Sequence, residues 1–350
     1  MIPAAARLLA FTAVLLATPV GVPATTPRAA PTRPAPLPAI RIRGIDYVNV
    51  ADAAVRFGLK SSGAAGVRTL TLSDASSRVE LEPGSRETAV NGSRVFLGQA
   101  VIARSGQVYV SKIDFERALL PMLRPALCGS PPRPPKLIAL DPGHGGRDDG
   151  TENSRLKLKE KTFTLDVAQR LKRRLEARGF KVVLVRETDT KIELPVRAEI
   201  ANRAGADVFV SIHFNALPND AKTKGIEVFT FAPQFQRSTN SWNPDEKDDT
   251  EHEPAPGNRH DPWNVVLAQA MHRELLANLK TFDRGKKIAH FGVLRTLECP
   301  GVLVECGFLS NDDEARKIAT PAYREQIAES LLAGLQTYAE TIGGLYGKTK

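Results

Sequence analysis

Short apolar runs alternate with amphipathic segments along the chain from Lys136 onward. The apolar runs are brief, rich in Val, Ile and Phe, and bounded by turn-forming residues, a pattern typical of buried strands. They occupy residues 136–140, 181–186, 206–216, 225–231 and 302–308.

The segments between these runs have helical periodicity. In residues 160–179, apolar side chains recur every fourth residue from Phe163 to Leu175, which predicts a helix capped by Gly179. Strands that alternate with helices predict an α/β fold, a layered, mostly parallel sheet flanked by helices. Sites in such folds form beyond the carboxyl ends of the strands. Further helices are expected over 194–205, 262–280 and 321–341.

The chain before residue 128 follows a different pattern, with short strand signals separated by turn residues. This pattern of short strands and helices predicts a small α+β domain. Short strands are expected at 68–73, 78–83, 93–98 and 107–112, and short helices at 57–60 and 115–123.

Two proline-rich stretches divide the chain. Residues 25–40 are rich in Pro and Ala, and residues 128–136 contain four prolines, so both are expected to be linkers. The small α+β domain is therefore expected over 41–127 and the α/β domain over 137–343.

The N-terminus has the features of a secretory signal. Arg7 precedes an apolar run over 8–17 that is too short to span a bilayer, and small residues follow it. We expect a signal peptide over 1–24, with a retained membrane anchor as the alternative. An exported protein in the periplasm or the extracellular cell wall is predicted, with no stable membrane span after signal cleavage.

The net charge and the cysteine content add little to these predictions. The net charge of +9 favours anionic partners, but no Lys/Arg run with interleaved aromatic residues occurs, so no nucleic-acid partner is expected. The three cysteines, Cys128, Cys299 and Cys306, cannot form a complete disulfide framework, and buried free thiols are expected.

Residues 232–261 interrupt the alternation, because they have no apolar period. Within them, 243–261 contain seven acidic and two basic residues. This segment is expected to be a surface insertion that is flexible or acts as a lid. A plain solvated loop is the alternative.

Four residues near the predicted strand ends have the chemistry of a hydrolytic metal site. His144 lies in the turn DPGHGG, His213 and Glu305 lie near the ends of two apolar runs, and Glu160 opens a predicted helix. Two imidazoles and one carboxylate bind zinc in many hydrolases, and a second carboxylate can transfer protons. Singly, each residue also fits a structural role, such as a loop histidine or a charge at a helix N-terminus.

The stretch from Lys136 to about Ala339 resembles the zinc-dependent N-acetylmuramoyl-L-alanine amidases of the Amidase_3 family. The resemblance rests on motifs that occur in the family's order. They are IALDPGHGG, the glutamate of KEK, VLVRETD, RAEIANRAGADVFVSIHFNA, GVLR and PGVLVECGFLSN.

This resemblance implies the site and the substrate. Zn²⁺ is the implied cofactor, with His144, Glu160 and His213 as ligands and Glu305 as the catalytic residue. The implied reaction is cleavage, by zinc-activated water, of the amide between the lactyl group of N-acetylmuramic acid and L-alanine in peptidoglycan. The alternatives are a non-catalytic peptidoglycan-binding module and a zinc peptidase that acts elsewhere on the stem peptide.

The resemblance does not decide the roles of three further residues or the need for a partner protein. Asn215 and Arg295 are candidate substrate-binding residues, and Arg197 is a weaker one, but structural roles fit them equally well. Some cell-division members of the family carry an inserted helix that blocks the zinc, so a protein activator is expected if the 232–261 insertion is autoinhibitory. Its Pro, Asn and Asp content argues against a helix.

The small N-terminal domain more loosely resembles copper amine oxidase N-terminal-like domains. The resemblance rests on YVNVADAAVRFGL, the AVNG turn and the VYVSK strand. It implies no copper. A wall-binding role and a purely structural one are both compatible with it.

Overall fold

A computed structural model describes residues 35–63, 68–217, 220–239 and 250–347. The predicted signal peptide, most of the first linker and residues 240–249 of the acidic insertion lie outside the described residues. The predictions for those segments remain untested.

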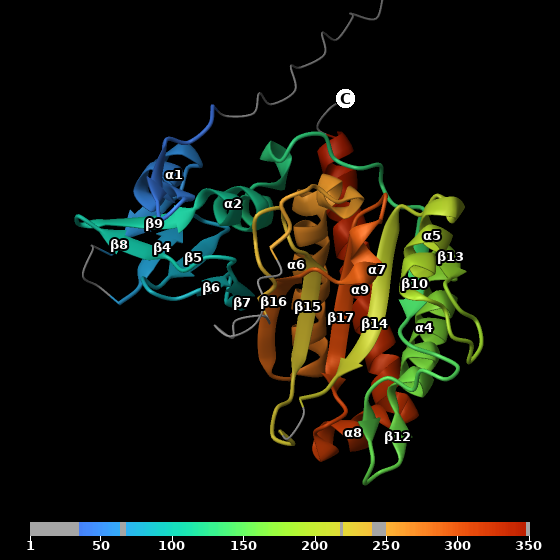
Figure 1. Ribbon diagram of the computed structural model, residues 1–350. Helices are drawn as coiled ribbons and strands as arrows, with labels where there is room; N and C mark the ends of the chain where they lie inside the picture. The colour runs from blue at the N-terminus through green and yellow to red at the C-terminus, as the bar shows by residue number, and fades with distance from the viewer. Residues whose placement is uncertain (1–34, 64–67, 218–219, 240–249, 348–350) are drawn as a thin grey trace, which may run out of the picture.

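The α/β part contains a mixed sheet that is mostly parallel, as the sequence predicts (Figure 1). The strand order is β13-β10-β14-β17-β15-β16, and β15 runs antiparallel to β17 while the other neighbouring pairs are parallel. The strands are β10 (Leu137–Pro142), β13 (Lys181–Leu184), β14 (Val208–Asn215), β15 (Ile226–Phe231), β16 (Asp283–Ala289) and β17 (Gly301–Phe308).

Helices cover both faces of this sheet. Alternate residues of β14 enter different cores: Val210 and Ile212 pack with the helices of one face, and Phe209 packs with those of the other. The first face is covered by α4 (Glu160–Glu176), α6 (Asp261–Leu279) and α9 (Pro321–Gly347), and the second by α5 (Leu194–Ala204) and α7 (Gly292–Arg295). The remaining elements are the hairpin strands β11 (Glu152–Asn153) and β12 (Leu158–Lys159), a 3₁₀ turn over Pro256–His260, and α8 (Asp312–Ile318).

The N-terminal block forms its own hydrophobic cluster between Leu37 and Leu123. One of its sheets has the order β1-β2-β9-β8, and its other strands form antiparallel hairpins from β3 to β7. These strands are β1 (Ala39–Ile42), β2 (Ile45–Asn49), β3 (Lys60–Ser62), β4 (Leu70–Ser73), β5 (Arg78–Leu81), β6 (Glu87–Val90), β7 (Ser93–Phe96), β8 (Ile102–Arg104) and β9 (Gln107–Ser111). The helical elements are α1 (Val50–Arg56), α2 (Lys112–Asp114), a π-helical turn over Phe115–Leu119, α3 (Leu120–Leu123) and a 3₁₀ turn over Pro125–Leu127.

The predicted helix at 57–60 is wrong. The Asn49 side chain caps α1 by accepting hydrogen bonds from the amides of Ala51 and Asp52, so the helix begins earlier than expected. Gly58 has a φ of 69°, which ends the helical path, and β3 starts at Lys60.

A backbone bridge joins the two parts of the chain. Val95 of β7 pairs with Lys286 of β16, so the hairpins of the N-terminal block continue the sheet of the α/β part (Figure 1). The amide of Arg94 also donates to Asp283 Oδ2 at 2.9 Å. The edge of the α/β sheet is therefore covered by the preceding block.

The described part of the acidic insertion is less exposed than expected. Ala232, Gln236 and Ser238 are buried, and Gln236 Nε2 donates to the buried Asp114 of the N-terminal block at 2.8 Å. The segment leaving β15 thus packs against the N-terminal block before it reaches the residues that are not described.

Two further observations concern the whole described chain. Cys299 and Cys306 are buried free thiols, as the sequence predicts, whereas Cys128 is only half-buried. Among the described residues, no helix is both long and apolar enough to cross a membrane.

Candidate metal centre and active site

The segment DPGHGG begins in the last two residues of β10, and its turn directs His144 toward β14. His144 has a φ of 61°, a left-handed conformation that is uncommon for a residue with a side chain. Its neighbour Gly143 packs against the ring of His213, because a Cβ on Gly143 would lie 2.3 Å from His213 Cε1. The glycine therefore allows the turn and the end of β14 to approach closely.

Glu160, the first residue of α4, lies between the two histidines. Its Oε2 is 3.1 Å from His144 Nε2, and its Oε1 is 2.9 Å from His213 Nδ1. Within the described residues, this trio is the one group of three His, Cys, Asp or Glu whose ligand atoms converge, all within 4.8 Å of one another. The structure thus contains a possible metal-binding triad.

The Glu160 carboxylate is 2% exposed and well supplied with donors. The amide of Thr151 donates to Oε2 at 2.8 Å, and the amide of Phe214 donates to Oε1 at 2.9 Å. Burial alone would raise the pKa of Glu160, but the hydrogen bonds from His144 and His213 hold it well below its usual range. The surroundings of Glu160 therefore favour its ionised form.

Asp148 orients His144 from the opposite side. Its Oδ1 lies 3.0 Å from His144 Nδ1, which leaves Nε2 to face Glu160. Burial lowers the pKa of His144, yet the hydrogen bond to Glu160 raises it overall. A carboxylate on the second nitrogen of a ligand histidine fixes its tautomer and orientation.

Arg197 supports the same turn and does not face solvent. Its guanidinium donates to Asp141 Oδ1 at 2.7 Å and to the carbonyl of His144 at 2.9 Å. Asp141 also accepts from the hydroxyl of Ser211 at 2.7 Å. These contacts fix the backbone of the histidine turn and favour the structural role for Arg197.

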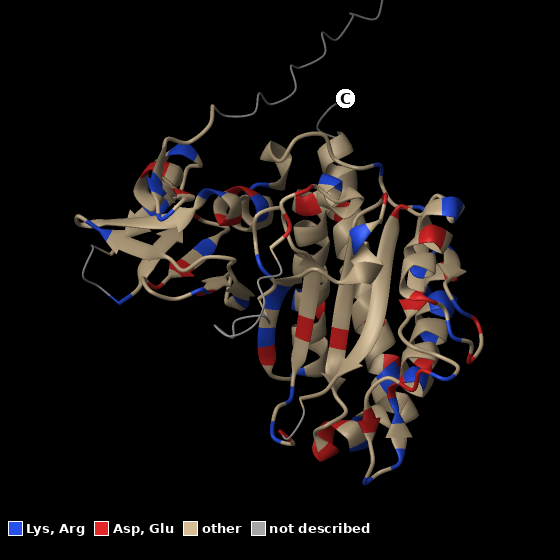
Figure 2. Cartoon of the chain, viewed as in Figure 1, with Lys and Arg blue, Asp and Glu red and all other residues tan. Residues whose placement is uncertain are grey.

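Glu305 lies at the centre of the sheet, next to a metal-site histidine. In the strand register it pairs with His213 on one side and with Glu227 of β15 on the other. Figure 2 shows acidic positions side by side on β15 and β17, with basic positions on neighbouring β16. Glu305 Oε2 is buried without a hydrogen-bond partner, and burial, then the charges of Glu160 and Glu227, raises the pKa of Glu305 well above its usual range.

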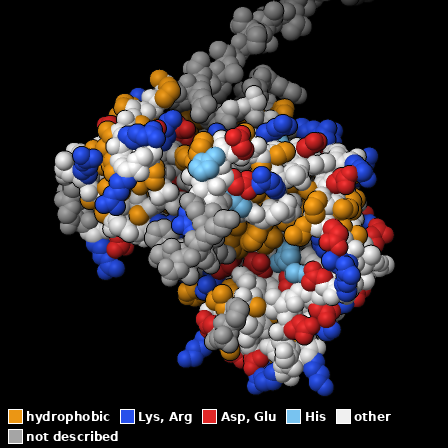
Figure 3. Space-filling model, in the orientation of Figure 1, with side chains coloured by type: hydrophobic (Ala, Val, Ile, Leu, Met, Phe, Trp, Pro, Cys, Tyr) orange, Lys and Arg blue, Asp and Glu red, His pale blue; other side chains and the backbone are white. Residues whose placement is uncertain are grey.

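A cavity of about 430 Å³ opens beside these residues. Figure 3 shows histidine and acidic side chains together in a hollow of this face, next to apolar side chains. The cavity is wide enough for a segment of a peptide or sugar. Its lining includes His144, His213, Glu305, Lys191, Leu194 and Phe291.

The other predicted residues have partners within the protein. Asn215 Nδ2 donates to Glu227 Oε2 at 3.1 Å, and Arg295 forms an ion pair with Glu251 of the acidic insertion. Neither residue lines the cavity that contains His144. A substrate-binding role for Asn215 and Arg295 stays a prediction.

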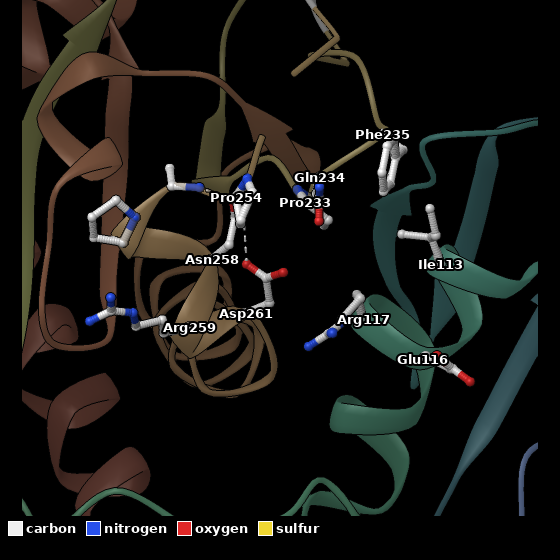
Figure 4. Close-up of a pocket in the computed structure, with 12 residues that line it drawn as sticks. Ile113, Glu116, Arg117, Pro233, Gln234, Phe235, Pro254, Asn258, Arg259 and Asp261 are labelled. Atoms are coloured by element: carbon white, nitrogen blue, oxygen red, sulfur yellow. Dashed lines mark hydrogen bonds between the residues drawn. The ribbon is translucent and has the colours of Figure 1, made fainter. Parts of the chain in front are cut away.

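A second cavity, of about 470 Å³, lies at the junction of the two parts of the chain. Figure 4 shows Arg117 of the N-terminal block and Asp261 of α6 on facing sides of it, with Asn258 hydrogen-bonded to Asp261 at 3.2 Å. Asp261 is 6% exposed, and burial raises its pKa to about 7. None of the metal triad lines this cavity.

Two residues of the site were missed from sequence. Asp148 follows His144 by four residues, and its spacing alone could have marked it as a partner of the histidine. Glu227 is a single charged residue inside an apolar strand, which is a signal of a buried, paired carboxylate.

Comparison with known proteins now decides the family. Residues 138–337 match the family model Amidase_3, described as N-acetylmuramoyl-L-alanine amidase. The chain belongs to this amidase family. Membership supports hydrolysis of the amide between N-acetylmuramic acid and L-alanine, with peptidoglycan as the substrate.

Individual members of the family are similar over more than half of the chain. The germination-specific N-acetylmuramoyl-L-alanine amidase of Bacillus subtilis is 30% identical over 218 residues, which cover 58% of this chain and 79% of that protein. The amidase AmiC of Escherichia coli is 32% identical over 222 residues, covering 58% of this chain and 53% of AmiC. The chain therefore spans about half of AmiC.

A solved structure supports the fold. The crystal structure of N-acetylmuramoyl-L-alanine amidase from Clostridium difficile 630 matches with a TM-score of 0.50 and 32% identity. The match covers 59% of this chain and 98% of that one. The layered α/β architecture is thus the amidase fold, and the N-terminal block lies outside the match to the family model.

Proposed function

We propose that this protein is an exported zinc amidase that cleaves the bond between the lactyl group of N-acetylmuramic acid and L-alanine in peptidoglycan. One observation carries the proposal. His144, Glu160 and His213 converge at the carboxyl ends of adjacent strands, and Glu305 lies beside them in an open cavity.

The donor set fits zinc. Two imidazoles and one carboxylate leave a coordination position open, which is typical of catalytic zinc sites. His144 presents Nε2 because Asp148 engages its other nitrogen, and Glu160 is held as an anion. When bound, zinc would supply Lewis-acid activation of the attacking water and of the amide carbonyl.

Glu305 is the proposed proton carrier. Its side chain lines the cavity, and its buried Oε2 has no hydrogen-bond partner in the protein, so this oxygen is not committed to another residue. It would accept a proton as water adds to the lactyl carbonyl, and then donate that proton to the L-alanine nitrogen as the C–N bond breaks. The products are a free lactyl carboxylate and a peptide with a free N-terminal amine.

Three further assignments belong to this proposal. The apolar N-terminal segment directs export to the periplasm or the cell wall. The N-terminal block, over 41–127, is a copper amine oxidase N-terminal-like domain that assists contact with the wall, and the catalytic domain spans 137–343. A protein activator is proposed only if the acidic insertion restricts access to the cavity.

Digestion of purified sacculi tests the function. The wild-type chain is expected to release intact stem peptides that begin with L-alanine, as identified by mass spectrometry. Glu305→Gln is expected to lower this release by about 10²–10⁴-fold while zinc content, measured by elemental analysis, stays the same. Glu298→Gln is the matched control, because Glu298 is an exposed glutamate close in sequence.

Two outcomes would contradict the proposal. Cleavage inside the stem peptide would make the protein a peptidase. Stoichiometric zinc and tight sacculus binding without any cleavage would make it a binding module.

A further inference from the structure

A row of paired side chains crosses the sheet from the metal triad toward the N-terminal block. Glu305 pairs with Glu227, whose side chain is only 3% exposed. Two cations of β16 neutralise Glu227: Lys287 Nζ lies 2.7 Å and Arg284 Nε 2.8 Å from its Oε1. Burying a carboxylate without such partners is energetically costly.

Lys287 lies between two aromatic rings. Its ammonium is 5.3 Å from the ring centre of Phe96 and 5.8 Å from that of Phe229. Phe229 belongs to the α/β part, whereas Phe96 ends strand β7 of the N-terminal block. The Lys287 side chain is 12% exposed, so the two rings shield the ion pair from water.

Phe96 is fixed tightly against β16. A Cβ on Gly285 would lie 2.8 Å from Phe96 Cε2, so the glycine provides the space that the ring occupies. The adjacent residue Val95 makes the backbone bridge to Lys286, and Arg94 donates to Asp283. The position of Phe96 is therefore set by the junction itself.

The other end of this chain of contacts reaches the active site. Glu227 Oε2 accepts a hydrogen bond from Asn215, two residues after His213, and Glu227 lies beside Glu305 in the sheet. Loss of the Phe96 ring would hydrate Lys287 and weaken its hold on Glu227, while Arg284 would still hold the same oxygen. Loss of the ring is therefore expected to displace residues of the site without unfolding it.

We propose that Phe96 of the N-terminal block is a positioning residue of the active site, acting through Lys287 and Glu227. The inference rests on the proposed amidase function. It gives the N-terminal block a role in turnover itself, separate from any contact with the cell wall.

A soluble muropeptide is the substrate that separates these two roles, because its hydrolysis does not require binding to the wall. Phe96→Leu is expected to lower kcat by about threefold to tenfold with little change in KM and unchanged zinc content. Phe96→Tyr, which keeps the ring, is expected to restore kcat. Lys287→Met is expected to lower kcat at least as much as Phe96→Leu.

The double variant supplies the decisive comparison. If Phe96 acts through Lys287, Phe96→Leu adds no further loss of kcat to Lys287→Met. Phe282→Leu is the matched control: this exposed ring lies 5.8 Å from the Arg94 guanidinium at the same junction, whereas the rings found near the Lys287 ammonium are those of Phe96 and Phe229. Its kcat is expected to equal that of the wild type, and urea unfolding checks that each variant is folded.

The outcomes are distinguishable. An active wild type with an unchanged Phe96→Leu variant, multiplicative losses in the double variant, or an equal loss in Phe282→Leu would overturn this inference and leave the amidase function intact. A wild-type chain that releases no peptide from the muropeptide would overturn both.

Discussion

Glu160 and Glu305 are two glutamates of one site with opposite surroundings. Glu160 receives two backbone hydrogen bonds and faces two histidines, whereas Glu305 Oε2 is buried with no partner and lies next to Glu227. The pKa of Glu160 is lowered and that of Glu305 is raised. The difference teaches that neighbouring donors and charges, not residue type, set the pKa of each carboxyl group, and it supports the proposed roles of Glu160 in metal binding and of Glu305 in proton transfer.

The largest effect is expected for a variant that removes the negative charge of Glu160. Glu160→Gln removes the anion between the two histidines, so the chain is expected to lose stoichiometric zinc, and muropeptide hydrolysis is expected to fall by more than about a hundredfold. Elemental analysis after dialysis measures the metal. Glu305→Gln is the comparison variant, since it should lose activity and keep zinc; equal zinc content in both variants would refute the division of roles.

A smaller effect is expected for Asp148, which orients His144 toward Glu160. Asp148→Ala frees Nδ1 of His144, so zinc affinity is expected to fall by about 10–100-fold in a chelator competition titration. Asp149→Ala is the matched control, because Asp149 pairs with Lys159 and Lys161 and not with the histidine. Similar affinities for the two variants would show that Asp148 does not orient His144.

The smallest expected effect tests whether burial alone raises the pKa of a carboxyl group, as it does in part for Glu305. Asp261 lies outside the site, and burial raises its pKa from 3.8 to about 7. The folded state therefore binds the proton more tightly than the unfolded state, so this group loses stabilising free energy as the pH rises from about 4 to about 7.

Asp261→Asn should remove that pH dependence. Between pH 5 and pH 7, the free energy of unfolding of the wild type is expected to fall by about 2 kcal/mol relative to the variant. Urea unfolding at both pH values measures it, with Asp52→Asn in the exposed first turn of α1 as the control. Parallel pH profiles for wild type and Asp261→Asn would show that burial does not hold this proton.

Most of the α/β part could be predicted from sequence, because its strands are buried on both faces and read as apolar runs. The strand β16 could not, since DRGKKIA places Asp283, Lys286 and Lys287 within it. These charges are tolerated only because His272, Glu227 and Phe96, all distant in sequence, pair with them or cover them. A local hydrophobic pattern along the sequence does not identify such distant partners.

The candidate site shows the same limit. His144, Glu160 and His213 lie together as the sequence predicts, because the two histidines lie at strand ends that meet at one edge and Glu160 begins the helix α4 beside them. The partner of Asn215, by contrast, is Glu227, and that of Arg295 is Glu251; neither pairing follows from spacing along the chain. Their substrate roles stay predictions.

The bridge between β7 and β16 has a consequence for dissecting this protein. A catalytic fragment cut within the proline-rich stretch before Leu137 would lose β7 and leave β16 as an open edge strand. Open edges offer unpaired amides and carbonyls to strands of other molecules and so promote aggregation. A fragment without the N-terminal block is therefore expected to aggregate more readily than the full chain.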